Sequence, residues 1–288
     1  MRKQAFRLIA MVVVLASLSL GAPPAGAGTD GFYVSLGDSL SVGFQPNRGE
    51  TEKGYVDELW RRVLDTMPTL QLQKFGCVGE TTTSMVDGTG SLCTYDAGSQ
   101  LAEAVAFLEA NAGQISFVTI DIGANDVVDG CMDFDTGVLD RTCVEELLPD
   151  LSARVTSIVD ALRAAVGPDV PVVGMTYYDP FLGLWGLVPG GKVLARTAQR
   201  AWRTFDAALT EAYVGAGAAV ADVAATFRTD DFETKVVVDG RRVPINVALT
   251  CRWTWFCSKV YEGDPHANTI GYRKIARTFH QVLTPLLV

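Results

Sequence analysis

Histidine is the scarcest chemically useful residue in this chain, which contains only His266 and His280. Imidazole is the side chain best suited to take up and release a proton near neutral pH. His280 lies next to Phe279 in an amphipathic C-terminal stretch, which favours a structural or surface role. His266 follows Asp264 in the irregular polar segment 262–268. A loop histidine beside a carboxylate is suited to general-base catalysis.

A nucleophile for such a base is available in Ser39, within the Gly-Asp-Ser-Leu segment 37–40. This segment follows the apolar run 32–36, and ligands of doubly wound sheets bind at the carboxyl ends of the strands. Taken alone, the tetrapeptide also fits an ordinary Ser/Asp turn. The Gly-x-Ser-x-Gly elbow of α/β-hydrolases is not present at this serine, because Ser41 occupies the position of the second glycine.

Two more candidate residues follow the next apolar runs. Gly79 comes after the run 70–75, and Asn125 comes after the run 115–122. Parallel strands end at the same edge of a sheet. We therefore expect these two residues to lie in one pocket with Ser39 and His266.

The elements that must position these residues alternate along the chain. Strands are predicted at 32–36, 70–75, 115–122, 170–176 and 218–223, and helices at 54–67, 101–110, 144–166, 192–214 and 269–283. This alternation predicts an α/β fold, a three-layer α/β/α sandwich with a five-stranded parallel sheet. No linker or repeat interrupts the pattern, so residues 28–288 are interpreted as a single domain.

Residues 1–27 have the pattern of an export signal. Arg2, Lys3 and Arg7 precede the apolar run 8–20, and small residues occupy 25–27. The run is shorter than the roughly 20 residues that span a bilayer. The sequence therefore predicts a cleaved signal peptide, a secreted protein and no stable membrane anchor.

Charge and cysteine content restrict the partners further. The net charge of -9 disfavours nucleic acid and anionic membranes as partners.

Six cysteines in an exported chain indicate disulfides. Fifteen pairings are possible, and pairing of sequence neighbours is the simplest. The spacing does not suggest zinc, and we interpret Asp133 and Asp135 as part of a solvated loop rather than a calcium site. No metal or cofactor is predicted. The three neighbouring pairs are Cys77 with Cys93, Cys131 with Cys143, and Cys251 with Cys257.

Taken together, four blocks of this sequence resemble the GDSL esterases and lipases, the SGNH hydrolase family. The blocks are segment 37–40, the surroundings of Gly79, segment 123–126 (Gly-Ala-Asn-Asp) and segment 264–266 (Asp-Pro-His). The Cys-x-Gly-x-Thr-Thr of 77–82 is most similar to the secreted actinobacterial branch. The resemblance extends from Phe32 to the last helix and implies the flavodoxin-like fold of that family.

The resemblance also implies a chemistry. Ser39 would attack an ester carbonyl after His266 takes its proton. The backbone amides of Ser39 and Gly79 and the side-chain amide of Asn125 would hold the oxyanion. The expected activity is a metal-independent carboxylic ester hydrolase that passes through an acyl-Ser39 intermediate and acts as a monomer.

One departure from the family pattern concerns the partner of His266. The family usually places an aspartate three residues before the histidine and a proline after it, but Gly263 and Ala267 occupy these positions here. The imidazole still needs an acceptor for its Nδ1 hydrogen bond. Either the Asp264 side chain or a backbone carbonyl near 263–264 could supply it.

The substrate is less defined by the sequence. The apolar segment 181–188 and the aromatic segment 253–256 could line an acyl groove, and the latter could stack on sugars, but core packing is an equal interpretation of both. Lipid-type esters are the first expectation, with polysaccharide O-acetyl esters as the alternative. A non-catalytic carbohydrate-binding module is the least favoured hypothesis, because a binding protein needs no oxyanion donors.

Overall fold

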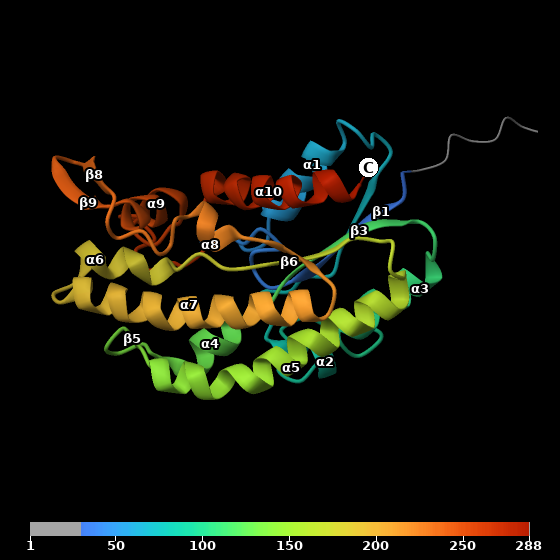
Figure 1. Ribbon diagram of the computed structural model, residues 1–288, viewed down its shortest axis with the longest axis horizontal. Coiled ribbons are helices and arrows are strands. Elements are labelled where there is room, and N and C mark those ends of the chain that lie inside the picture. Colours follow the sequence, from blue (N-terminus) through green and yellow to red (C-terminus); the bar gives the residue numbers. More distant parts are fainter. Residues whose placement is uncertain (1–29, 288) are drawn as a thin grey trace, which may run out of the picture.

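The centre of the molecule is a five-stranded parallel sheet, as the sequence predicts (Figure 1). The computed structural model describes residues 30–287, so the predicted signal peptide lies outside the described residues. The strand order is β2-β1-β3-β6-β7. The strands are β1 (Phe32–Gly37), β2 (Gln71–Lys74), β3 (Ile115–Asp121), β6 (Val172–Met175) and β7 (Ala219–Ala221). The strand β2 lies on one side of β1, and β3 and the later strands lie on its other side. Where the strand order reverses in this way, a crevice forms at the carboxyl ends of the two neighbouring strands, here β1 and β3.

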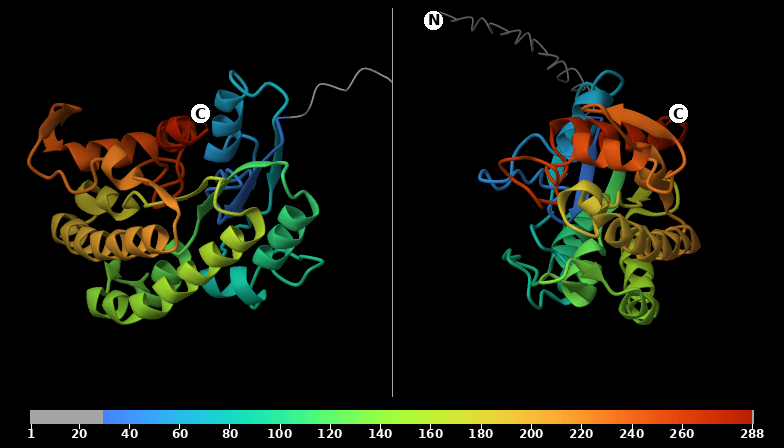
Figure 2. Two further views of the ribbon diagram at one scale, coloured as in Figure 1. Left: turned by 45° about the vertical axis from the view of Figure 1, so that its right-hand side comes forward. Right: turned by 90° about the vertical axis from the view of Figure 1, so that its left-hand side faces the viewer.

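Helices cover both faces of the sheet and complete the three layers (Figure 2). On one face α1 (Tyr55–Val63) packs against α10 (Thr269–Leu283). The other face is covered by α3 (Gln100–Ala110), α5 (Arg141–Val166) and α7 (Gly191–Gly215). Because both faces are covered, the central strands are almost wholly apolar and buried, as in Val118 and Ile120 of β3.

Short elements fill the connections and were not predicted. They are α2 (Thr82–Asp87), α4 (Ala124–Cys131), β4 (Met132–Asp133), β5 (Val138–Leu139), η1 (Pro180–Gly183), α6 (Leu184–Leu187), α8 (Val223–Thr226), β8 (Lys235–Val238), β9 (Arg241–Pro244), α9 (Ile245–Trp253) and η2 (Thr284–Leu286). Each is too short for a hydrophobic period to stand out in the sequence. Most of them lie at the end of the molecule where the strands terminate (Figure 1), and α4 and η1 line the candidate site.

Both apolar segments whose roles were left open contribute to packing. Leu182 is fully buried, and the ring of Phe181 meets those of Trp202 and Phe256 edge to face. Trp253 packs edge to face against Phe227. The interpretation of 181–188 and 253–256 as packing segments is therefore the one that the structure supports.

The cysteines pair with their sequence neighbours. The disulfides are Cys77–Cys93, Cys131–Cys143 and Cys251–Cys257. Asp133 ends β4 and Asp135 lies in the turn before β5; both are exposed, and Asp133 accepts hydrogen bonds from the backbone of this turn. Across residues 30–287 no cluster of three or more His, Cys, Asp or Glu side chains is arranged to hold a metal ion. No helix in the same range has the length and apolar character to cross a bilayer.

A close contact between β6 and α7 gives a test of the packing. A Cβ atom on Gly174 would lie 2.5–2.6 Å from ring carbons of the buried Tyr213. We expect Gly174→Ala to lower the free energy of unfolding by about 1–3 kcal/mol, because the ring is enclosed. Gly186→Ala is the matched control, since nothing lies within 4 Å of its added Cβ. Urea denaturation of the oxidised protein would measure both, and equal effects would contradict the packing described.

Candidate active site

The candidate nucleophile lies in the turn that follows β1. At Gly37 the backbone has φ +148, and an added Cβ would lie 2.2 Å from Asp121 Oδ1, so only glycine fits. The Gln100 side chain fixes this residue from both sides: its Oε1 accepts from the Gly37 amide at 2.7 Å, and its Nε2 donates to the Gly37 carbonyl at 3.1 Å. The strand end is thereby fixed, and Ser39 follows it at the edge of the sheet.

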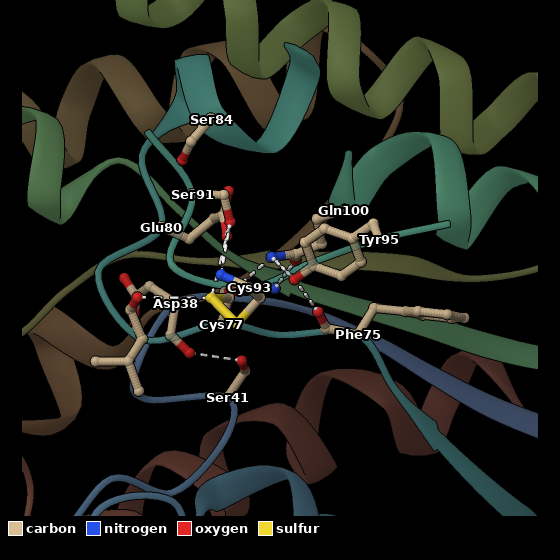
Figure 3. The surroundings of a disulfide bond; sticks show 12 residues. Asp38, Ser41, Phe75, Cys77, Glu80, Ser84, Ser91, Cys93, Tyr95 and Gln100 are labelled. Carbon is tan, nitrogen blue, oxygen red and sulfur yellow. Dashed lines mark hydrogen bonds between the residues drawn. A yellow bond between two sulfur atoms is a disulfide. The ribbon is translucent and has the colours of Figure 1, made fainter. Parts of the chain in front are cut away.

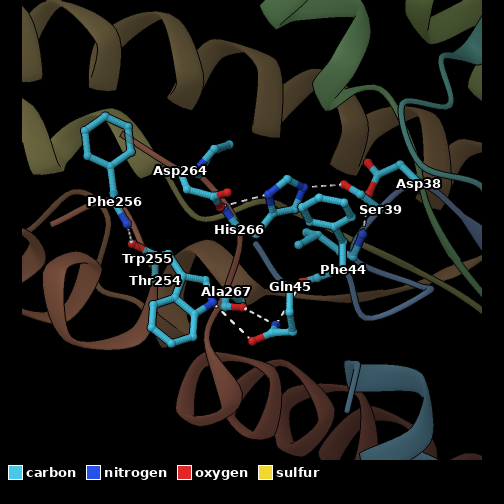
Figure 4. A network of polar contacts seen from close by, with 12 residues as sticks. Asp38, Ser39, Phe44, Gln45, Thr254, Trp255, Phe256, Asp264, His266 and Ala267 are labelled. Carbon is cyan, nitrogen blue, oxygen red and sulfur yellow. Dashed lines mark hydrogen bonds and ion pairs between the residues drawn. The ribbon is translucent and has the colours of Figure 1, made fainter. Parts of the chain in front are cut away.

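The structure brings Ser39, His266 and Asp264 into one chain of contacts (Figure 4). Ser39 Oγ lies 2.9 Å from His266 Nε2, and His266 Nδ1 lies 2.9 Å from Asp264 Oδ1. The two side chains of the His–Asp pair are only 18% and 20% exposed. Of the two acceptors that the sequence allowed for Nδ1, the group that faces it is the Asp264 carboxylate.

A tight turn explains how an aspartate only two residues before the histidine reaches its ring. Asp264 Oδ1 also accepts a hydrogen bond from the His266 backbone amide at 2.9 Å, which closes an Asx-type turn. Gly263 enters this turn with φ +87 and donates its amide to Phe256 O at 2.9 Å. The altered spacing is therefore accommodated by the local backbone.

Side chains that the sequence did not single out hold the histidine loop. The ring of Phe44 lies 4.4 Å from the imidazole, centroid to centroid. Gln45 Nε2 donates to Ala267 O at 3.1 Å, and Gln45 Oε1 accepts from Trp255 Nε1 at 3.1 Å. Phe44 and Gln45 come from the loop after the nucleophile, so the two halves of the site support each other. No spacing in the sequence marks these contacts, because they join residues more than 200 positions apart.

The predicted oxyanion donors lie around the crevice between β1 and β3. Asn125, in the first turn of α4, donates its Nδ2 to Glu80 O at 2.8 Å, which leaves its second N–H available. In the described part of the chain the backbone amides of Ser39 and Gly79 donate no hydrogen bond. Gly79 itself does not line the cavity at Ser39, but the Glu80 bond keeps its turn beside Asn125.

A disulfide and a buried carboxyl hold the turn that carries Gly79 (Figure 3). Cys77 and Cys93 close the loop, and Ser91 Oγ donates to Glu80 Oε2 at 3.0 Å. Burial raises the pKa of the Glu80 carboxyl. The loop is thus fixed by a covalent bond and a buried polar contact.

A cavity opens beside the nucleophile. Its polar side is formed by Asp38, Ser39, Asn125 and His266. The rest of its wall is largely apolar and comes from the turn after β1, α4, α7 and the segments around Tyr178 and Pro265. These residues are Leu40, Ala124, Val128, Tyr177, Tyr178, Pro180, Trp202 and Pro265. Segment 181–188 does not line this cavity, and Phe181 instead supports Trp202 from behind. The arrangement can hold an apolar group with a polar reacting centre at one end.

The comparison with protein families identifies the chain. The model of the GDSL-like lipase/acylhydrolase family matches residues 35–274. The chain belongs to this family. It is accordingly a carboxylic ester hydrolase.

Solved structures agree with this assignment at the level of the fold. The hydrolase superposes on the extracellular lipase of Streptomyces rimosus with a TM-score of 0.55 at 19% identity, over 88% of this chain and 99% of that one. For phospholipase A1 of Streptomyces albidoflavus the TM-score is 0.52 at 18% identity, with 88% and 98% covered. An acetyl xylan esterase gives 0.51 at 11% identity, with 87% and 98% covered. No curated protein sequence matches the hydrolase significantly.

One acid behind the cavity wall affects stability. Asp179 is fully buried between Tyr178 and Pro180; its Oδ1 accepts from the Phe181 amide, and its Oδ2 has no partner within residues 30–287. Burial raises the pKa of Asp179 to about 8. An unfolded aspartate has a pKa of about 3.9. Between these two values the folded state binds the proton and the unfolded state does not, so the free energy of unfolding falls as the pH rises.

We expect Asp179→Asn to weaken the pH dependence of the free energy of unfolding. The loss of unfolding free energy between pH 5 and pH 8 should be smaller than in the parent hydrolase by about 4 kcal/mol, because the amide does not titrate. Urea denaturation at the two pH values measures it. Asp135→Asn, at an exposed position, is the control and should leave the slope unchanged. An unaltered slope in a folded Asp179→Asn protein would contradict the prediction.

Proposed function

We propose that the hydrolase is a secreted serine esterase or lipase that cleaves lipid-type carboxylic esters through an acyl-Ser39 intermediate. The observation that carries this proposal is the continuous contact chain from Ser39 through His266 to Asp264 at a cavity with a largely apolar wall. His266 Nε2 takes the proton of Ser39 Oγ as the oxygen attacks the ester carbonyl. The protonated imidazole then gives that proton to the leaving alkoxide, and water repeats the sequence to release the acid.

The developing oxyanion is assigned to three donors. These are the backbone amides of Ser39 and Gly79 and the free N–H of Asn125. The bond from Asn125 to Glu80 O supports this role, because it orients the amide before substrate arrives. Preorganised donors of this kind are each worth about 3 kcal/mol of transition-state stabilisation.

The apolar wall of the cavity favours an acyl chain over a sugar. Val128 of α4 and Trp202 of α7 are placed where such a chain would lie. Two fold relatives are described as an extracellular lipase and a phospholipase A1, which supports lipid-type esters. Secretion is supported by the three disulfides and by the signal-like composition of residues 1–27.

Ester hydrolysis tests the nucleophile and the substrate class together. We expect the oxidised protein to hydrolyse p-nitrophenyl esters, with a preference for chains longer than acetate, because the cavity wall is apolar. Ser39→Ala should lower kcat by about 10⁵-fold or more, since the attacking oxygen is removed. Initial rates from acetate to palmitate, together with labelling by a fluorophosphonate probe, provide the measurement.

The possible outcomes separate the alternatives. A profile confined to acetate, with activity on acetylated xylan, would replace the lipid assignment by a polysaccharide O-acetyl esterase. Full activity in Ser39→Ala would overturn the acyl-serine mechanism. Failure of both probe labelling and ester cleavage in a folded sample would favour the binding-module hypothesis.

The contribution of Asp264 has its own test. We expect Asp264→Ala to lower kcat/KM by about 100-fold or more, because the variant lacks the acceptor that orients the imidazole and fixes its tautomer. Glu262→Ala, an exposed carboxylate in the same loop, is the matched control and should retain activity. An Asp264→Ala protein as active as the control would assign the orientation of His266 to backbone groups instead.

A further inference from the structure

The apolar wall of the cavity has a partly exposed rim and a buried floor. Val128 of α4 is half-buried and Pro265 of the histidine loop is exposed, so these two residues form the rim. A substrate chain that enters from solvent therefore passes the rim before it meets the floor. The floor consists of buried residues from the end of β6, η1 and α7, namely Tyr177, Tyr178, Pro180 and Trp202.

Trp202 is the largest side chain of the floor, and other rings enclose it. It is only 2% exposed. Its ring meets Phe181 edge to face with centroids 5.7 Å apart, and it meets Phe205 in the same way at 5.4 Å. The indole N–H has no hydrogen-bond partner within residues 30–287, so packing holds this ring in place. Because protein interiors are close-packed, the ring cannot retreat from a ligand without displacing its aromatic neighbours.

The support of Trp202 extends to a disulfide loop. Phe181 meets Phe256 edge to face on its other contact, with centroids 6.1 Å apart. Phe256 is buried and lies in the short segment that the Cys251–Cys257 disulfide closes. Two layers of aromatic packing thus connect the floor to a covalently closed segment.

The two tyrosines of the floor are held by hydrogen bonds. Tyr177 Oη donates to Asp38 Oδ2 at 2.8 Å, in the nucleophile turn. Tyr178 Oη donates to Pro265 O at 2.8 Å, and its ring stacks on Phe227 with centroids 4.5 Å apart. The floor therefore has a fixed depth, because each of its large rings is fixed by groups behind or beside it.

The reacting centre decides which part of an ester lies over this floor. In the proposed mechanism His266 gives its proton to the leaving oxygen, so the leaving group lies on the His266 side of the carbonyl carbon. The carbonyl oxygen is assigned to the oxyanion donors, among them Asn125. The acyl chain is the remaining substituent, and the wall that Val128 and Trp202 contribute from α4 and α7 is available to it.

We propose that Trp202 is a specificity-determining residue whose ring closes the acyl part of the cavity and limits the length of acyl chain that the hydrolase buries. Chains that end before the indole gain affinity with each added methylene. A longer chain turns out past Val128 towards solvent, and its last methylenes stay in water. Each of these forgoes the roughly fourfold gain that a buried methylene brings. This inference rests on the proposed function of Ser39 and His266.

The test replaces the indole and measures selectivity for chain length. We expect Trp202→Ala to raise the ratio of kcat/KM for p-nitrophenyl laurate to that for p-nitrophenyl butyrate by about 10-fold or more, because further methylenes then become buried. Trp202→Phe keeps an aromatic ring in the packed cluster, so it also serves if the alanine variant does not fold. It should raise the ratio by about fourfold, which corresponds to one methylene.

A tryptophan outside the cavity provides the matched control. Trp185 of α6 packs against Phe232 and does not line the cavity. We expect Trp185→Ala to leave the laurate-to-butyrate ratio of the parent unchanged, since it removes an indole of the same size from a different packed cluster.

A second readout needs no turnover. Ser39→Ala lacks the attacking oxygen but keeps the cavity wall, so calorimetry follows the binding of laurate and butyrate to it. Adding Trp202→Ala or Trp202→Phe to this background should lower the Kd for laurate relative to that for butyrate by the same factors. If the parent cleaves no ester, the proposed function fails, while these titrations still test the depth of the cavity.

Two outcomes would overturn the inference. In one, folded Trp202→Ala or Trp202→Phe protein keeps the laurate-to-butyrate ratio of the parent. In the other, the Trp202 variants change selectivity along a series of butyrate esters with alcohols of increasing length but not along the acyl series. That result would place the leaving alcohol, and not the acyl chain, against the indole.

Discussion

The contact between Ser39 Oγ and His266 Nε2 spans 227 positions of the chain, and most of the architecture serves to keep it at 2.9 Å. Ser39 is placed by the end of β1, which Gln100 and Asp121 enclose. His266 is placed by a turn that packs against the Phe44–Gln45 loop. Tyr177 and Tyr178 connect both sides to a third strand end. The parallel sheet therefore sets the position of Ser39, because it brings the ends of β1 and β6 to one edge, and the loop contacts of Phe44 and Gln45 set the position of His266.

The buried acids near this edge have a cost in stability and a use in function. Asp38, Asp121, Asp179 and Asp206 are all less than a tenth exposed. Burying carboxyls without cations is unfavourable, and it raises their pKa values. Such an arrangement is tolerated where hydrogen bonds compensate, as the Tyr177 hydroxyl and amide do for Asp38 and Asp206. Concentration of these groups beside a reactive centre is typical of functional sites.

The three disulfides reinforce the connections around the site. Cys77–Cys93 closes the loop of Gly79, and Cys131–Cys143 joins the end of α4, the helix of Asn125, to the start of α5. Cys251–Cys257 closes a segment whose Thr254 forms a bridge with Ala267, next to His266. Irregular segments have few backbone hydrogen bonds of their own, so covalent closure restricts their unfolded conformations and stabilises the folded ones.

By itself, the sequence determined the layers of the fold and the identity of the candidate residues. Apolar runs and helical periods are local properties, so they predicted the five strands and the main helices, and the four short blocks identified Ser39, Gly79, Asn125 and His266. The tertiary structure decided which group faces His266 Nδ1, since the Asx-type turn at Asp264 depends on backbone angles and not on spacing. It also placed Phe181 behind Trp202 and Leu182 in a separate packed cluster, and it revealed the hydrogen bond between Asp38 and Tyr177. These contacts join residues that are far apart in the chain, and no local pattern encodes which distant side chain will fill a given space.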